Sequence, residues 1–148
     1  MLKIEKAVYD FIRSHGEQTY SHECCGVLLG RDNGEGRVAV RAKPCGNTRT
    51  DSPQNRYNID PKDLIRIQLD AREDNLDIVG FYHSHPDHPA QWSQTDLAEA
   101  YWFGCSYVIT SVNQGHADLT NSFLLAGNEE DKRLENEAIE VIATAEVA

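Results

Sequence analysis

The sequence is poor in basic residues, and lysine is especially scarce. Of its 148 residues 24 are acidic and 14 are basic, which gives a net charge of −10. Nucleic acids and anionic membranes attract basic patches, so this balance disfavours both as the main partner. No apolar run approaches the length of a membrane-spanning helix, and the N-terminal "MLKIEKAVYD" lacks the apolar core of a signal peptide. These absences favour a cytoplasmic protein, expected to fold as one domain over residues 1–148.

Cysteines are few and lack metal-binding spacing. The four of them contain no C-x-x-C pair, so neither a zinc ribbon nor a thioredoxin motif is indicated. Cys24 and Cys25 lie in an apolar run, where free cysteines usually act as small buried hydrophobes. We expect free thiols, because a reducing compartment disfavours disulfides.

Hydrophobic periodicity predicts helices and strands that interleave without an internal repeat. We expect helices over residues 3–14, 61–75 and 93–103, and a closing helix with Leu134, Ala138, Val141 and Ala145 on one face. We expect a hairpin over 23–43, with strands "ECCGVLLG" and "RVAVRA", and further strands over 77–83, 105–112 and 118–125. Residues 43–58 are polar and rich in proline, glycine and asparagine, which predicts a long loop. The pattern indicates the α/β class with a mixed sheet.

The stretch "FYHSHPDHPAQWSQTD", residues 81–96, contains three of the six histidines. His83 and His85 are two residues apart at the end of a predicted strand, so their side chains share a face and can converge on one ion. Pro86 would end the strand and leave both rings in place. Two neutral imidazoles and one carboxylate, with water in the fourth position, form a standard catalytic zinc set. The stretch therefore predicts a zinc site whose third ligand is a nearby carboxylate.

Two choices of carboxylate are open. "HSHPDH" fits the H-x-H-x-D-H spacing of metallo-β-lactamase-like hydrolases, with Asp87 and His88 binding a second metal. Against it, such folds need a longer chain, and only His116 follows. The other choice is Asp96 in "SQTD", although Ser-x-x-Asp ahead of an apolar helix is also a capping box with Ser93 as the cap. The cap and the ligand are compatible roles, because a first-turn aspartate would be held rigidly beside the strand end.

Glu23 is the candidate base for such a site. It opens the otherwise apolar strand "ECCGVLLG", where a charged side chain is either exposed or faces a polar site. A carboxylate beside a metal-bound water can take its proton and pass it to a leaving nitrogen. His22 and Glu23 do not begin an H-E-x-x-H motif, because Gly26 stands where the second histidine is needed.

These residues together resemble the JAMM (MPN-plus, JAB domain) zinc metalloproteases, and most closely their small prokaryotic stand-alone members. The family pattern is a glutamate on an early strand, then H-x-H-P, six residues and S-x-x-D. Here Glu23 is followed by "HSHP" at 83–86, "DHPAQW" and "SQTD" at 93–96, with no departure in spacing. The resemblance implies a single-domain, cytidine-deaminase-like α/β fold with a mixed curved β-sheet flanked by helices.

The resemblance also implies a mechanism and a substrate class. His83, His85 and Asp96 would hold one zinc ion, Glu23 would activate the water and shuttle its proton, and Ser93 would donate a hydrogen bond to the oxyanion. Family substrates are amide bonds at the C-terminal tails of ubiquitin-like or sulfur-carrier proteins, and we expect the 43–58 loop to cover such a tail. The alternative is a scaffold of the same fold that has lost the zinc, although such chains usually break a motif that is intact here.

Overall fold

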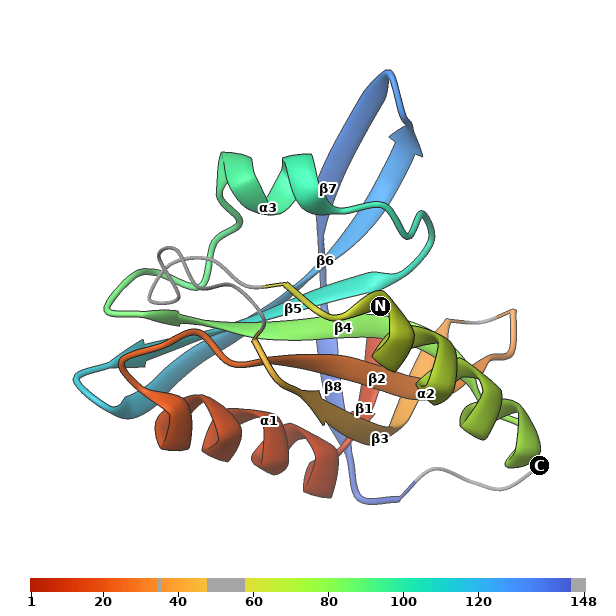
Figure 1. Cartoon of the computed structure of the whole chain (residues 1–148), viewed down its shortest axis with the longest axis horizontal. Helices are drawn as coiled ribbons and strands as arrows, with labels where there is room; N and C mark the ends of the chain where they lie inside the picture. The colour runs from red at the N-terminus through yellow and green to blue at the C-terminus, as the bar shows by residue number, and fades with distance from the viewer. Residues whose placement is uncertain (35, 48–57, 145–148) are drawn as a thin grey trace.

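One mixed, strongly curved sheet runs through the computed structural model, which describes residues 1–34, 36–47 and 58–144 (Figure 1). Within these residues eight strands lie in the order β7-β6-β5-β4-β2-β3-β1-β8. The strands are β1 (Leu2–Glu5), β2 (Cys25–Asp32), β3 (Arg37–Cys45), β4 (Asp77–Pro86), β5 (Ser106–Asn113), β6 (His116–Asn128), β7 (Asp131–Glu137) and β8 (Ile139–Ile142). The helices are α1 (Lys6–Thr19), α2 (Pro61–Glu73) and α3 (Gln94–Glu99). Parallel pairs (β1–β3, β1–β8, β4–β5) accompany antiparallel ones, so the predicted α/β class with a mixed sheet is confirmed.

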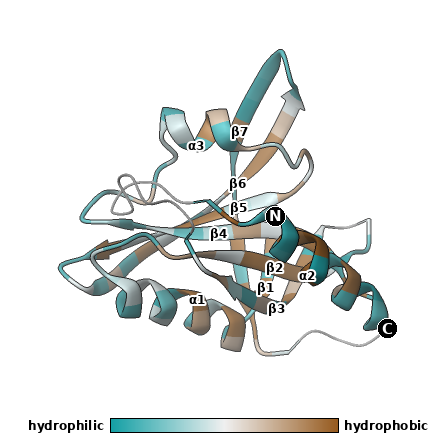
Figure 2. Ribbon diagram, in the orientation of Figure 1, coloured by the Kyte–Doolittle hydropathy of each residue, from teal (hydrophilic) through white to brown (hydrophobic). Residues whose placement is uncertain are grey.

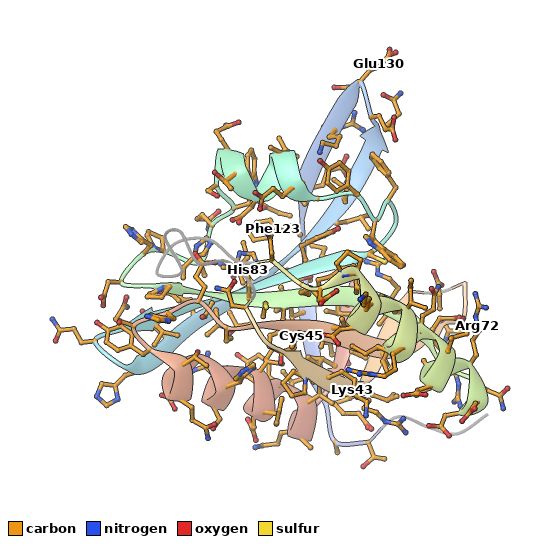
Figure 3. All side chains as sticks on the ribbon, in the orientation of Figure 1. Lys43, Cys45, Arg72, His83, Phe123 and Glu130 are labelled. Atoms are coloured by element: carbon orange, nitrogen blue, oxygen red, sulfur yellow. The ribbon has the colours of Figure 1, made fainter. Side chains whose placement is uncertain are left out.

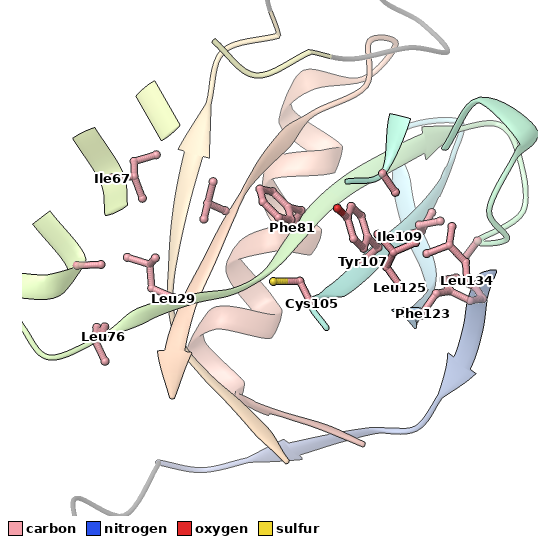
Figure 4. Packing of buried hydrophobic residues seen from close by; sticks show 14 residues of the cluster. Leu29, Ile67, Leu76, Phe81, Cys105, Tyr107, Ile109, Phe123, Leu125 and Leu134 are labelled. Carbon is pink, nitrogen blue, oxygen red and sulfur yellow. The ribbon is translucent and has the colours of Figure 1, made fainter. Parts of the chain in front are cut away.

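Two hydrophobic cores cover the two faces of the sheet. Neighbouring residues of β2 point to opposite faces: Val27 and Leu29 join the core under α2, whereas Leu28 joins the core under α1. Figure 4 shows the first core, in which Phe81 stacks on Tyr107 with ring centroids 5.4 Å apart. Because both faces are buried, the central strands read as continuous apolar runs rather than as alternating ones.

The pairing of β2 with β4 places the early glutamate near the histidines. Cys25 lies opposite His83 in this antiparallel pair, and Gly26 lies opposite Tyr82. A Cβ at Gly26 would lie 2.3 Å from the Tyr82 ring, so only glycine fits beside that side chain. The predicted hairpin of β2 and β3 is confirmed, with β2 beginning at Cys25 rather than at Glu23.

The N-terminal prediction was wrong in part. Residues 2–5 form β1 rather than the start of the helix, because Leu2 and Ile4 are buried in the sheet between β3 and β8. The helix also continues past residue 14 to Thr19. Gly16 makes this possible, because its position lies close to Val112 and Ser84, where α1 packs directly on the sheet.

The predicted closing helix was wrong over its described residues, whereas Ala145 lies outside them. Leu134 lies in β7 and Val141 in β8, two strands that are consecutive in the chain yet form opposite edges of the curved sheet. In β7 Leu134 is the one residue that is buried as a whole, and the strand is largely hydrophilic in Figure 2, as an edge strand should be. Strand β7 pairs with β6, and β8 pairs with β1. This pairing prevails over the helical spacing, because the segment has too few apolar residues to form a buried helix face.

The third helix is shorter than predicted, ending at Glu99 instead of residue 103. The Lys132 ammonium group donates to the carbonyls of Ala98 and Ala100 and so satisfies the C-terminal end of α3. Beyond it, the Trp102 amide donates to the Tyr107 hydroxyl. These tertiary partners replace the helical hydrogen bonds that the periodicity predicted.

The predicted start of the second helix is confirmed. Helix α2 begins after Asp60, whose side chain accepts from the Lys62 amide, and Pro61 is its first residue. Residues 48–57, most of the predicted loop, lie outside the described residues. All four cysteines are free thiols, three of them buried. Among the described residues, no helix combines the length and apolarity that crossing a membrane requires.

Candidate metal centre

The two histidines of the motif lie near the end of β4 and are almost fully buried. His83 and His85 are 2 % and 8 % exposed, and their Nε2 atoms lie 3.2 Å apart. Figure 3 shows His83 on the central part of the sheet, on the side of α3. As the strand alternation predicts, the two rings share a face and present the same ring nitrogen to one point.

Asp96 completes the cluster from the first turn of α3. Its Oδ1 lies 3.2 Å from His83 Nε2 and its Oδ2 lies 3.1 Å from His85 Nε2. The helix start is a full capping box, in which Ser93 Oγ accepts from the Asp96 amide and Asp96 Oδ2 accepts from the Ser93 amide. The cap and the approach to the histidines therefore occur together, because the cap orients the carboxylate toward β4.

These three side chains fit a zinc ion. Ligand atoms of His83, His85 and Asp96 lie within 4.8 Å of one another. In a tetrahedral site with zinc–ligand bonds of about 2.0–2.1 Å, neighbouring ligand atoms lie about 3.3 Å apart. The 3.2 Å between the two Nε2 atoms matches that edge length, and each ring nitrogen lies 3.1–3.2 Å from one of the two Asp96 oxygens. Two imidazole nitrogens and a carboxylate oxygen also form the donor set of a catalytic zinc site with one position left for water.

Electrostatics support a cation at this point. Burial would raise the pKa of Asp96, yet the adjoining His83 and His85 rings hold it well below its ordinary value. Burial lowers the pKa of His83. For His85 burial acts in the same direction, but hydrogen bonds to Asp96 and the Pro89 carbonyl outweigh it and raise the pKa. The centre thus favours a carboxylate paired with one positive charge, and a metal ion supplies that charge without a proton.

Glu23 faces the same centre and is also buried, at 4 % exposure. Its Oε1 has no hydrogen-bond partner, and burial raises the pKa of the carboxyl to about 8, against the opposing effect of His85. The backbone is held firmly, because the Cys24 amide donates to Ser84 Oγ and the Ser84 amide donates to the Cys24 carbonyl. The sequence left open whether the Glu23 side chain is exposed or faces a polar site, and in the structure it faces a polar site.

A groove opens from the centre to solvent. It has a volume of about 410 Å³ and is lined by Glu23, His85, Trp92 and Ser93, among others. Ser93 is exposed, and while its oxygen accepts from the Asp96 amide its hydroxyl hydrogen is free to point into the groove. A substrate atom in this groove would therefore meet both a carboxylate and a hydroxyl donor.

Comparison with known families decides the assignment. The sequence model of prokaryotic homologs of the JAB domain matches residues 5–126. The chain belongs to this family. The match covers the whole region from Glu23 to Asp96 and most of the sheet that positions it.

Named relatives support the same placement. The chain is 37% identical over 89 residues to a desampylase from Haloferax volcanii, covering 60% of this chain and 62% of the relative. It is 29% identical over 102 residues to a probable TtuB-protein conjugate cleaving protease from Thermus thermophilus, covering 69% and 65%. The matched regions thus span less than two thirds of the length of these relatives.

Solved structures match over nearly the full chain. A protein from Salinibacter ruber has a TM-score of 0.73 at 36% identity, with 95% of this chain and 91% of that chain covered. A protein from Desulfitobacterium hafniense has a TM-score of 0.79 at 27% identity, covering 96% and 94%. A JAB1/MPN domain protein from Archaeoglobus fulgidus has a TM-score of 0.60 at 16% identity, covering 95% and 98%, and shares the fold. The JAMM/MPN fold expected from the motif is confirmed.

The metallo-β-lactamase-like alternative has no support in this JAB-family chain. Asp87 is exposed and turns away from the histidines, with its carboxylate accepting from the Tyr20 hydroxyl and the Gln114 amide. Its φ of 58° places the turn directly after Pro86, where β4 ends. His88 is exposed in the same turn. Neither belongs to the metal-ligand cluster among the described residues.

Sequence reasoning missed Glu99, which lies at the end of α3 one turn after Asp96. Burial is the main cause that raises the pKa of Glu23, and the negative charge of Asp96 raises it further. The negative charge of Glu99 acts in the same direction. Glu99 lines a second groove of about 510 Å³ whose walls include Phe81, Tyr101 and Trp102. The spacing of Asp96 and Glu99 on a short helix was the available signal, but many surface helices carry such pairs.

Proposed function

We propose that this chain is a zinc-dependent metallopeptidase or isopeptidase that hydrolyses amide bonds at the C-terminal tail of a ubiquitin-like or sulfur-carrier protein. One observation carries the proposal: buried Glu23 faces the ligand cluster of His83, His85 and Asp96, although it is remote in sequence. Desampylases from two organisms and a conjugate-cleaving protease among the relatives support a protein conjugate as the substrate.

His83, His85 and Asp96 are the residues that would hold the metal. A zinc ion bound there would act as a Lewis acid toward the scissile carbonyl and lower the pKa of a coordinated water to about 7. Glu23 would take a proton from the attacking water and deliver it to the leaving nitrogen. Its buried position suits the first step, because a carboxylate whose pKa is raised accepts a proton more readily than an exposed one, and the carboxyl so formed holds the proton that the leaving nitrogen needs.

Ser93 would stabilise the negative charge that develops on the carbonyl oxygen. Its hydroxyl is fixed by the Asp96 amide, so it is oriented before the substrate binds. Loss of one such donor typically costs about 10²- to 10³-fold in kcat. The groove of about 410 Å³ in front of Glu23 and Ser93 would admit an extended tail but not a folded domain, which suits cleavage at a slender terminus.

The test uses the full chain purified without a histidine tag. We expect about one zinc ion per chain, and cleavage of a ubiquitin-like protein after its C-terminal residue when it is attached to a lysine side chain, read by mass spectrometry. His83→Ala should lose both zinc and cleavage. His116→Ala, which changes an exposed histidine outside the cluster, is the matched control and should keep both.

Three outcomes separate the possibilities. A zinc-loaded chain that cleaves neither isopeptide-linked nor linear fusions of ubiquitin-like proteins would contradict the substrate class. A chain that folds without binding zinc would indicate a scaffold of the same fold. Cleavage that persists in His83→Ala would exclude a catalytic role for the cluster.

A further inference from the structure

The orientation of His85 depends on one backbone carbonyl. His85 Nδ1 lies 2.9 Å from the carbonyl oxygen of Pro89. A carbonyl can only accept, so Nδ1 carries the hydrogen and Nε2 presents its lone pair to the point shared with His83 and Asp96. The position of the Pro89 carbonyl therefore fixes both the tautomer and the tilt of a metal ligand.

Two side chains from the sheet hold the peptide groups on either side of that carbonyl. Ser111 Oγ donates to the His88 carbonyl at 2.6 Å, and Asn121 Nδ2 donates to the Ala90 carbonyl at 2.9 Å. Ser111 also lies 3.3 Å from the Asn113 side-chain oxygen, but its single hydrogen favours the much shorter contact. Three successive carbonyls in this turn thus accept from side chains, and the middle one accepts from the metal ligand.

It is unusual for side chains to bind the carbonyls of an exposed turn. His88 and Pro89 are exposed, and carbonyls in exposed turns ordinarily bond to water. Here Ser111 is 3 % exposed on β5, and Asn121 is half-buried on β6, the next strand of the sheet. The turn is therefore anchored to two strands that contribute no ligand to the metal centre.

We propose that Ser111 and Asn121 are positioning residues of the metal centre, which act through the Pro89 carbonyl on His85. The inference rests on the zinc site of the proposed function but not on its substrate. A group that accepts from the second nitrogen of a ligand histidine typically contributes about 10- to 100-fold in metal affinity, and here that group is the Pro89 carbonyl. Neither residue belongs to the H-x-H-P and S-x-x-D motifs, and both follow the motifs in the chain.

The test measures zinc affinity of the full chain by competition with a chromophoric chelator. Ser111→Ala and Asn121→Leu should each weaken zinc binding by about tenfold or more. In the zinc-loaded variants, NMR should show that the His85 Nδ1 hydrogen exchanges with solvent faster than in the parent chain. Asn121 is only half-buried, so Asn121→Leu carries the test if Ser111→Ala fails to fold.

Thr110→Val is the matched control. Thr110 lies beside Ser111 on β5, is 2 % exposed, and its hydroxyl bonds to the Thr120 hydroxyl at 2.9 Å instead of to the turn. This variant should lose a half-buried hydrogen bond yet keep parental zinc affinity and His85 Nδ1 hydrogen exchange. The inference is overturned if Ser111→Ala and Asn121→Leu both bind zinc as tightly as the parent, or if Thr110→Val weakens binding equally. Neither measurement uses a substrate, so a failure to cleave conjugates would remove the proposed function and leave this result standing.

Discussion

Glu23 and Glu137 are both buried carboxylates, but their surroundings are opposite. The Glu137 side chain is 6 % exposed and accepts from the Arg37 guanidinium and from the hydroxyls of Ser106 and Ser122. Glu23 is similarly buried, yet one of its oxygens has no partner and burial raises its pKa to about 8. The same carboxylate group therefore has charged and hydroxyl partners at Glu137, whereas at Glu23 one oxygen has no partner.

This difference indicates that Glu137 has a structural role and Glu23 a chemical one. Glu137 ends β7 at the point where the chain crosses to the opposite edge of the sheet, and the following carbonyl, of Ala138, accepts from the Leu2 amide. Its charge is fully satisfied, so it stabilises that crossing. A buried carboxylate without a partner costs stability, and such a residue persists where chemistry requires it.

The largest expected effect is on catalysis at Glu23. Glu23→Gln removes the group that accepts and returns the proton, so kcat on a ubiquitin-like conjugate should fall by about 10²- to 10⁴-fold. Zinc content should stay at the parental level, because Glu23 is not among the clustered ligands. Steady-state kinetics and metal analysis of the same preparation check both points. Parental turnover in this variant would remove Glu23 from the mechanism.

The same substitution at the other glutamate should act on folding instead. Glu137→Gln leaves the Arg37 guanidinium, whose side chain is 12 % exposed, without its counter-charge. Breaking a buried pair in this way typically lowers the free energy of unfolding by roughly 3–5 kcal/mol. Urea denaturation of the metal-free protein measures it, and zinc affinity should not change.

Glu135→Gln is the control for that measurement. Glu135 lies on the same strand, but its side chain is 50 % exposed and pairs with Arg133 at the surface. Surface pairs of this kind contribute about 0–1 kcal/mol, so its stability should stay near the parental value. If Glu137→Gln and Glu135→Gln lose equal free energy of unfolding, the buried ion pair of Glu137 stabilises the fold no more than a surface pair does.

Local chemistry made much of the site predictable from sequence. The i, i+2 histidines and the Ser93–Asp96 capping box depend on residues close in the chain, and both form as expected. Strands β1 and β8 could not be predicted, because β1 pairs with β3 and β8 pairs with β1, far away in sequence. Strand β7 pairs with the preceding β6, but its charged residues concealed the strand. Glu137 illustrates the limit: it lies in a charged stretch typical of a solvated helix face, and its partner Arg37 is 100 residues away.

The contribution of the Pro89 carbonyl was equally hidden from sequence. A backbone acceptor has no residue type, so no motif marks it, and the side chains that hold its neighbours come from β5 and β6. The placement of Glu23 was only half predictable. Its strand and its chemistry were readable, but whether it faced solvent or the metal centre depended on the pairing of β2 with β4.

The smallest expected effect is the pH dependence of stability at Glu23 in the metal-free protein. The unfolded carboxyl loses its proton near pH 4.5, whereas the folded one, buried beside His85, Asp96 and Glu99, keeps it to about pH 8. Between these values the folded state binds more protons, so rising pH lowers the free energy of unfolding. Glu23→Gln cannot ionise and should therefore be more stable than the parent by on the order of 1–3 kcal/mol at pH 8, with little difference near pH 4.5.

Urea denaturation of chelator-treated parent and variant at both pH values measures the gain. Added zinc should shrink it, because the cation favours the ionised carboxylate. A gain that is equal at the two pH values would mean that the carboxyl is not strained by its burial, and the contrast with Glu137 would then reduce to packing.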